Sequence, residues 1–243
     1  MAGLETLRLR VRDPEAQRAF YCSVLGMRDQ GEGRVGYAAS EVALRFEQAE
    51  AAYAPRATDL YWKIAISVPN IEQAVQQLEA RGVVCTAPRQ FEDVGYLAHF
   101  ADPEGFAIEL IDHHFQGDRP AQFDDPDRLG GGAHISLVTL RCADIAAVEP
   151  ALLSWGMKVL SVQPVTSRGF TLHFYAATGE VPPDADVQAV ENRTWVYQRP
   201  YTVLEIQHPQ ALTQETAPPA GAAGYAGLTV GGHVLGRLGI CPD

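Results

Sequence analysis

Two arginines alternate with apolar residues near the start of the sequence. Residues 7–11 read Leu-Arg-Leu-Arg-Val, and an alternation of this period is typical of a half-buried strand. Such a strand places Arg8 and Arg10 on one face, and paired arginines are suited to binding carboxylate or phosphate groups. The pattern indicates a sheet face that could bind a small organic anion. The same arginines could instead reach solvent or pair with Glu5, Glu47 and Glu109.

A second feature with chemical potential is an aromatic run near residue 200. It contains Trp195, Tyr197 and Tyr201, with Arg199 among them. Aromatic rings could line a pocket for a planar ligand, and the Tyr hydroxyls would add polar contacts. The alternative is ordinary packing between a sheet and a loop.

Local motifs for metal or nucleotide chemistry are absent from the sequence. The histidines form no HExxH or HxxxE pattern, and no GxSxG or P-loop sequence occurs. The four cysteines, Cys22, Cys85, Cys142 and Cys241, are far apart and form no CxxC pair. We therefore expect reduced thiols rather than a disulfide framework or a cysteine metal site.

The composition favours an ordinary soluble protein. The formal net charge of −11 makes nucleic acid and anionic membranes poor partners. The first residues do not have the pattern of a signal peptide, and no apolar run approaches the roughly 20 residues needed to span a bilayer. We expect a cytoplasmic protein.

One strand–helix pattern occurs three times along the chain. Each copy has a strand, then an Asp or Asn helix cap, then a helix with an apolar stripe, then a glycine. The caps are Asp13, Asn70 and Asp144, and the glycines are Gly26, Gly82 and Gly156. Residues 227–230 resemble the start of a fourth copy, which the sequence leaves truncated.

Strand-like segments follow each predicted helix. In the second copy, residues 96–100 and 106–111 flank a turn at Asp102-Pro-Glu-Gly105. The pattern predicts an α+β fold of tandem βαβββ units, with curved mixed sheets and helices outside. We expect units to pair in chain order. Residues 1–115 would form one domain of two units, and residues 116–132 a linker. Residues 133–243 would form a second domain of one full unit and a truncated one.

Residues 20–27 and 102–110 resemble the starting and closing segments of units in the vicinal oxygen chelate superfamily. That superfamily includes glyoxalase I, bleomycin-resistance proteins and extradiol dioxygenases. The resemblance implies two glyoxalase-like domains and concave small-molecule pockets. It does not specify the reaction, because one scaffold can support many chemistries.

The resemblance also identifies site positions. Superfamily members that bind a metal carry a His or Gln on the first strand of a unit and a Glu on the last strand. The last-strand position matches Glu109 and Glu205, whereas Arg45 takes this place in the first unit and Lys63 stands at a first-strand position. This pattern departs from a metal site.

Strand alternation predicts the contents of the first cup, which is the concave pocket of the first domain. It collects four cations and one carboxylate, namely Arg8, Arg10, Arg45, Lys63 and Glu109.

Three histidines could still approach these cups. His134 and His173 are weak candidates for metal ligands beside Glu205, and His99 could point into the first cup or pack against a helix. The second cup would also contain Tyr201.

These residues lead to three functional hypotheses. The first is a metal-independent lyase or isomerase, without a cofactor, in which Glu109 or Glu205 is the general base and Arg or Lys stabilises an anionic intermediate. The second is a small-molecule binding or resistance protein without catalysis. The third is a metal-dependent dioxygenase or lyase that uses a divalent cation. In each case the partner is a small anionic or planar aromatic molecule. A homodimer could cover the open sheet edge.

Overall fold

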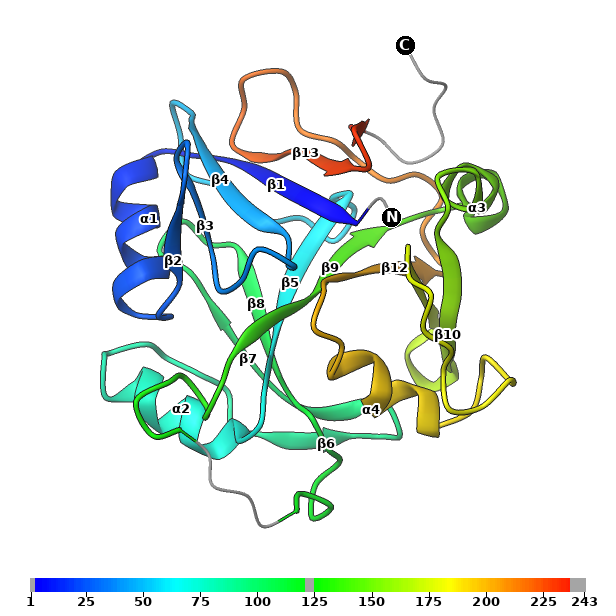
Figure 1. Ribbon diagram of the computed structural model, residues 1–243. Helices are drawn as coiled ribbons and strands as arrows, with labels where there is room; N and C mark the ends of the chain where they lie inside the picture. Colours follow the sequence, from blue (N-terminus) through cyan, green and yellow to red (C-terminus); the bar gives the residue numbers. More distant parts are fainter. Residues whose placement is uncertain (1–2, 121–124, 237–243) are drawn as a thin grey trace.

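The computed structural model describes residues 3–120 and 125–236, and three βαβββ units follow one another along the chain (Figure 1). The first unit consists of β1 (Leu4–Val11), α1 (Pro14–Ser23), β2 (Arg28–Gly31), β3 (Arg34–Gly36) and β4 (Ala43–Gln48). The second consists of β5 (Tyr61–Val68), α2 (Ile71–Glu79), β6 (Arg89–Phe91), β7 (Gly95–Ala101) and β8 (Ala107–Asp112).

The third unit has the same order with two insertions. It consists of β9 (His134–Arg141), α3 (Ile145–Ser154), β10 (Lys158–Val165), the 3₁₀ turn η1 (Thr166–Arg168), β11 (Phe170–Ala176), α4 (Glu191–Tyr197) and β12 (Val203–Pro209). Two strands follow, β13 (Gly224–Val230) and β14 (His233–Leu235). The predicted α+β class of tandem units is confirmed.

Helix capping explains the regular spacing of the units. Asp13, Asn70 and Asp144 each accept a hydrogen bond from a backbone N–H of the first helical turn, as predicted. Gly26 and Gly82 lie just after their helices with φ of 77° and 80°, a conformation that favours glycine. The repeated cap and glycine thus fix where each helix begins and ends.

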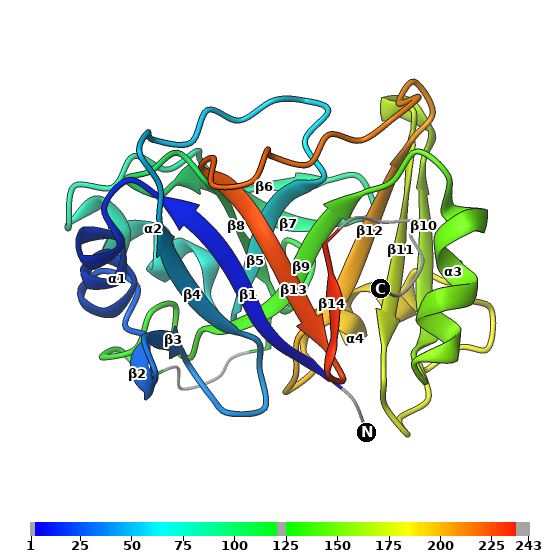
Figure 2. The ribbon, with the colours of Figure 1, turned by 90° about the horizontal axis from the view of Figure 1, so that it is seen from above.

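The units do not pair in chain order. One sheet contains eight strands in the order β10-β11-β12-β9-β5-β8-β7-β6, so the second unit pairs with the third through antiparallel β5 and β9. The other sheet, β14-β13-β1-β4-β3-β2, pairs the first unit with the last strands of the chain. Figure 2 shows β13 beside β1, although they lie near opposite ends of the sequence. The expectation that the first and second units share one sheet is therefore wrong.

Burial explains why β5 lies at the centre of the larger sheet. All of its residues except Trp62 are buried, whereas β1 carries the partly exposed Arg8 and Arg10 on one face. Two guanidinium groups are costly to enclose without partners, whereas the one charged residue of β5, Lys63, is buried with two carboxylate partners. Leu7 and Leu9, on the other face of β1, are fully buried in the main core, as the alternation predicts.

The described parts of the predicted linker pack closely on the second unit. Gln77 of α2 donates to the carbonyls of Pro126 and Arg128, and Asn70 N–H donates to Gly130 O. Residues 121–124 of the linker lie outside the described residues, as do residues 237–243 of the predicted fourth unit. None of the described helices is long and apolar enough to cross a membrane.

Candidate functional site

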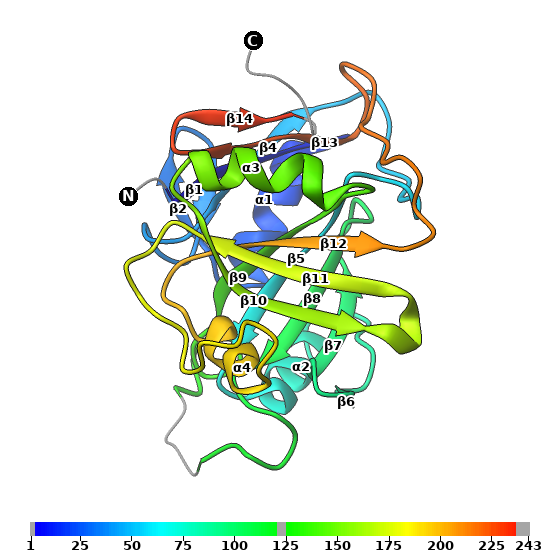
Figure 3. The same ribbon diagram turned by 90° about the vertical axis from the view of Figure 1, so that its right-hand side faces the viewer.

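The concave face of the eight-stranded sheet contains a cavity of about 250 Å³. Its walls are mainly apolar and come from both paired units, including Leu97 and Ile111 from one and Leu137 and Leu172 from the other. Helix α4 covers part of this face, as Figure 3 shows, and contributes Tyr197 to the cavity wall. The volume lies just below the range of roughly 300–1,000 Å³ that is usual for drug-sized ligands, so the cavity suits a small molecule.

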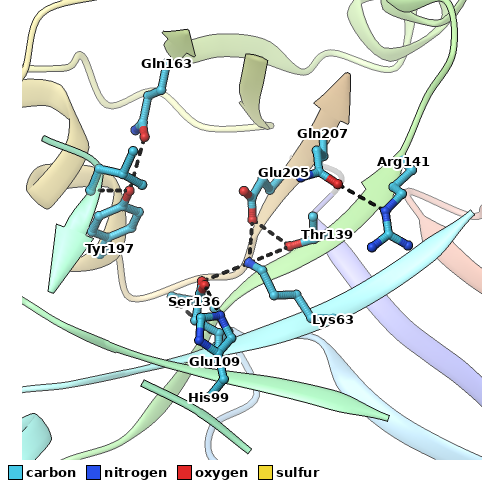
Figure 4. Close-up of polar contacts among 12 residues, drawn as sticks. Lys63, His99, Glu109, Ser136, Thr139, Arg141, Gln163, Tyr197, Glu205 and Gln207 are labelled. Atoms are coloured by element: carbon cyan, nitrogen blue, oxygen red, sulfur yellow. Dashed lines mark hydrogen bonds and ion pairs between the residues drawn. The ribbon is translucent and has the colours of Figure 1, made fainter. Parts of the chain in front are cut away.

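A buried lysine organises the polar floor of this cavity. Lys63 is 1% exposed, and its Nζ donates to Glu109 Oε1 at 2.8 Å, Thr139 Oγ1 at 3.1 Å and Glu205 Oε2 at 3.1 Å (Figure 4). An ammonium has three protons, so these acceptors use all of them. Lys63 is therefore occupied by the protein and has no remaining proton to donate to a ligand.

The register of the four central strands brings these residues together. Lys63 on β5 pairs with Thr139 on β9, and Thr139 pairs in turn with Glu205 on β12. On the other side of β5, Ala65 pairs with Glu109 on β8. Because residues two apart on a strand share a face, Lys63 and Ala65 point to the same side as their partners. The cluster thus lies at the junction of the second and third units.

Glu109 is a fixed anion. Its Oε1 accepts from Lys63, and its Oε2 accepts from His99 Nε2 at 3.0 Å. Burial raises its pKa, but the Lys63 ammonium and then the His99 hydrogen bond outweigh burial and lower the pKa to about 2. With both oxygens engaged, Glu109 is poorly placed to exchange a proton with a ligand.

Glu205 differs from Glu109 in its free oxygen. Lys63 Nζ and Thr139 Oγ1 both donate to Oε2, the latter at 2.6 Å, while Oε1 has no hydrogen-bond partner among the described residues. Figure 4 shows the second oxygen turned away from Lys63. Burial raises the pKa of Glu205, Lys63 offsets part of this effect, and the Glu109 charge raises the pKa further. A proton held by this carboxyl would sit on Oε1, because Oε2 is used as an acceptor.

The side chains around Lys63 do not match the divalent cation site that the resemblance implies. Within residues 3–120 and 125–236, no group of three or more His, Cys, Asp or Glu side chains is arranged to hold a metal ion. The space between Glu109 and Glu205 contains the Lys63 ammonium, whose pKa is raised because the two carboxylates outweigh the effect of burial. A charged ammonium repels a divalent cation, so these residues do not fit the metal.

The arginines predicted for the first cup lie elsewhere. Arg8, Arg10 and Arg45 belong to the six-stranded sheet, where Arg8 pairs in register with Arg45. Arg8 and Arg10 form ion pairs with Glu47 at 3.7 and 3.5 Å, and Arg45 is exposed. The structure therefore does not bring these arginines to Lys63 and Glu109. Instead it joins Lys63 and Glu109 to Glu205, which we had expected in a separate cup.

The predicted aromatic residues are only partly gathered at the cavity. Residues 191–197 form helix α4, and of the aromatic run only Tyr197 lines the cavity. Its hydroxyl donates a hydrogen bond to Val94 O at 2.9 Å, so Tyr197 forms part of the cavity wall. Trp195 stacks on the Arg199 guanidinium, and the Tyr201 hydroxyl donates to Glu180 at 2.6 Å, both away from the cavity.

The histidines predicted as weak metal candidates do not approach Glu205. His134 lies against His113, with ring centroids 5.4 Å apart, and His173 lies 6.4 Å from His208. On β11, Phe174 is the residue in register with Glu205, so the neighbouring His173 points to the opposite face of the sheet. His99, in contrast, points into the cavity, which was one of the two orientations expected for it.

Thr139 was missed by the sequence comparison. Lys63 lies seven residues before its helix cap Asn70, and the same spacing from Asp144 in the third unit selects Leu137. Leu137 lines the cavity wall, but the register brings Thr139 opposite Lys63. The β5–β9 pairing is regular from Lys63 to Ala65, so Leu137 lies opposite Ala65 instead, and irregularities flank this stretch on both sides. A polar residue two positions beyond Leu137, on the same strand face, is the signal that could have identified it.

The fold is that of the vicinal oxygen chelate superfamily, as the resemblance implied. Residues 3–110 match the Glyoxalase/Bleomycin resistance protein/Dioxygenase superfamily. Glyoxalase I from Zea mays is similar over 95% of this chain and 74% of its own, with a TM-score of 0.64 and 17% identity. A proposed dioxygenase from Bacillus subtilis is similar over 94% and 69%, with a TM-score of 0.56 and 16% identity. No curated protein matches the sequence significantly. At these identities the solved structures establish the fold and leave the reaction open.

Proposed function

We propose that this protein is a small-molecule enzyme that works by general acid–base catalysis, with Glu205 as the proton-transferring group. The observation that carries the proposal is the free Oε1 of a buried carboxyl with a raised pKa, on the floor of an otherwise apolar cavity. A general base is most effective when its pKa is tuned toward the working pH, and burial is the usual way to achieve this. An isomerase or lyase reaction beside a carbonyl group suits one such base.

The proposed proton transfer needs no other titrating group. In its ionised form, Glu205 Oε1 removes a proton from a carbon of the ligand, and the neutral acid then returns it to a neighbouring atom. Thr139 and Lys63 hold Oε2 so that Oε1 faces the ligand. Glu109 neutralises Lys63 and thereby keeps the floor from carrying excess positive charge.

The proposed reaction is independent of a metal. Lys63 supplies, between two carboxylates, the positive charge that a divalent cation would supply in metal-containing relatives of the fold. The third hypothesis, a metal-dependent dioxygenase or lyase with His134 or His173, therefore has the least support.

A binding or resistance protein remains the second candidate. The largely apolar cavity wall favours it, because apolar burial supplies affinity without chemistry. Glu205 argues for catalysis, since binding a small anion would gain nothing from a carboxyl with a free oxygen. The cytoplasmic location and the homodimer remain predictions.

Proton exchange tests the proposal. The wild-type chain would be incubated in D₂O with small carbonyl compounds whose carbonyl lies away from the carboxylate, such as 4-acetylphenylacetate and 4-oxopentanoate. Exchange at the carbon beside the carbonyl would be followed by NMR. We expect Glu205→Gln to slow exchange by about a hundredfold or more, since general bases contribute 10²–10⁴-fold. Glu79→Gln, an exposed carboxyl on α2, is the matched control and should exchange at the wild-type rate. Ligand binding without any catalysed exchange would favour the second candidate instead.

A further inference from the structure

The two paired units carry the same short pattern at the mouth of the cavity. The second unit has Arg89-Gln-Phe91 on β6, and the third has Arg168-Gly-Phe170 at the start of β11. All four of these Arg and Phe side chains line the cavity. Because the units face one another across β5 and β9, each contributes one guanidinium and one phenyl ring to a shared rim.

The two arginines of this rim have no carboxylate partner among the described residues. Arg89 and Arg168 are both exposed, and neither forms an ion pair with any residue in the described part of the chain. The described contact of Arg168 is with a ring of the opposite unit, its guanidinium carbon lying 5.7 Å from the centroid of Phe91. In contrast, Lys63 at the floor donates all its protons to the protein. Cationic groups available to a ligand thus lie at the mouth rather than at the floor.

Charge is therefore ordered along the axis of the cavity. The rim carries two free guanidinium groups, the wall is apolar, and the floor contains Glu109 and Glu205 on the far side. A carboxylate on a ligand is attracted to the rim and repelled from the floor, where Glu109 is ionised. A ligand with anionic groups at both ends would be repelled at one of them.

We propose that the natural ligand is an amphipathic monocarboxylate with an aromatic or branched apolar body. Its carboxylate binds Arg89 and Arg168 at the rim, and its body lies between Phe91 and Phe170. This orientation places the apolar end toward Glu205, so the inference rests on the proposed function for what happens there. The carboxylate–guanidinium pairing is the bidentate type for which arginine is suited.

Binding of matched probes tests this orientation. The full-length chain would be titrated by calorimetry with phenylacetate, with 4-methylpentanoate and with the neutral isostere phenylacetamide. We expect both acids to bind, and phenylacetamide to bind about tenfold more weakly than phenylacetate. Arg89→Gln and Arg168→Gln should each weaken binding of the acids about tenfold, because hydrogen bonds to charged groups are stronger than those between neutral groups. Arg28→Gln removes an exposed arginine from β2 in the other sheet and should bind as the wild type does.

The outcomes separate this inference from the proposed function. If neither acid binds, or if both rim variants bind the acids as well as Arg28→Gln does, the ligand class is wrong. Equal affinity for phenylacetate and phenylacetamide would also overturn it. Arginine-dependent binding in a protein that catalyses no proton exchange would support the ligand class while removing the catalytic role of Glu205. Binding measured on Glu205→Gln keeps the two questions apart, because that variant retains the rim.

Discussion

Lys63 Nζ lies 3.1 Å from Glu205 Oε2, although 142 residues separate the two in the sequence. The contact crosses the junction between the second and third units and makes one site from residues that we had expected in two. It also divides the roles of the carboxylates. Glu109 shares the lysine and has a second partner in His99, whereas Oε1 of Glu205 has no hydrogen-bond partner in the part of the chain that the structure describes.

Replacing Lys63 should destabilise the fold strongly. Lys63→Met leaves two buried carboxylates without their cation, and breaking a buried ion pair typically costs about 3–5 kcal/mol. The sequence contains only one other lysine, Lys158, whose Nζ contacts the Glu180 carbonyl near the surface, so Lys158→Met is a matched control. Urea unfolding should show a large loss of unfolding free energy for Lys63→Met and a small loss for Lys158→Met. Equal losses would contradict a special role for Lys63.

The loss of stability caused by Lys63→Met should also depend on pH. Without the ammonium, both glutamates would have folded-state pKa values above their unfolded ones, so the folded state would bind more protons than the unfolded state. A raised pKa contributes stability that is present at low pH and is lost as pH rises through the folded pKa. The variant should therefore lose stability between about pH 5 and pH 8, which unfolding curves at the two pH values would measure.

The two glutamates should respond differently to the same substitution. Glu109 has a lowered pKa, so its ionised form contributes stability at neutral pH that is lost as pH falls toward about 2. Glu205 has a raised pKa, so its contribution is greatest at low pH and decreases as pH rises through the folded pKa. Glu109→Gln should therefore cost several-fold more unfolding free energy at pH 7 than Glu205→Gln. The reverse order in urea unfolding would mean that Glu205 is the main partner of Lys63.

Thr139 should tune the proton affinity of Glu205. Its hydrogen bond lowers the pKa of Glu205, so Thr139→Val, which keeps the shape but removes the hydroxyl, should raise that pKa. Catalysis by ionised Glu205 falls as pH drops through this pKa, so the acidic limb of the pH–rate profile should move to higher pH. Thr139→Ser retains the hydroxyl and should restore the wild-type limb. A loss of rate with an unchanged profile would indicate only a packing role.

The sequence predicts the units well because their signals are local. Asp13 and Asn70 as caps, and Gly26 as a helix terminator, act within one turn of their own helix, so spacing alone reveals them. The hairpin at Asp102–Gly105 is equally local, since Gly105 N–H donates to Asp102 O. These signals are enough to specify the βαβββ unit.

The pairing of units depends on long-range contacts, so the sequence pattern does not contain it directly. Lys63 could be assigned to a first-strand position, but only the β5–β9 register shows that Thr139 and Glu205 lie beside it. The alternation that places Arg8 and Arg10 on one face is correct, but it does not say which other strands share that face. The sequence pattern does not identify the two rim arginines, because Arg89 begins a strand of only three residues and Arg168 ends the 3₁₀ turn η1, where no period marks them.

The pKa values of the two glutamates test the central claim most directly. Carboxyl ¹³C signals of Glu109 and Glu205 can be assigned by comparison with the Glu109→Gln and Glu205→Gln proteins and followed through a pH titration. We predict that the pKa of Glu205 lies above the ordinary value of 4.5 and that of Glu109 lies well below it. A Glu205 pKa equal to or lower than that of Glu109 would contradict the assignment of Glu205 as the proton-transferring group.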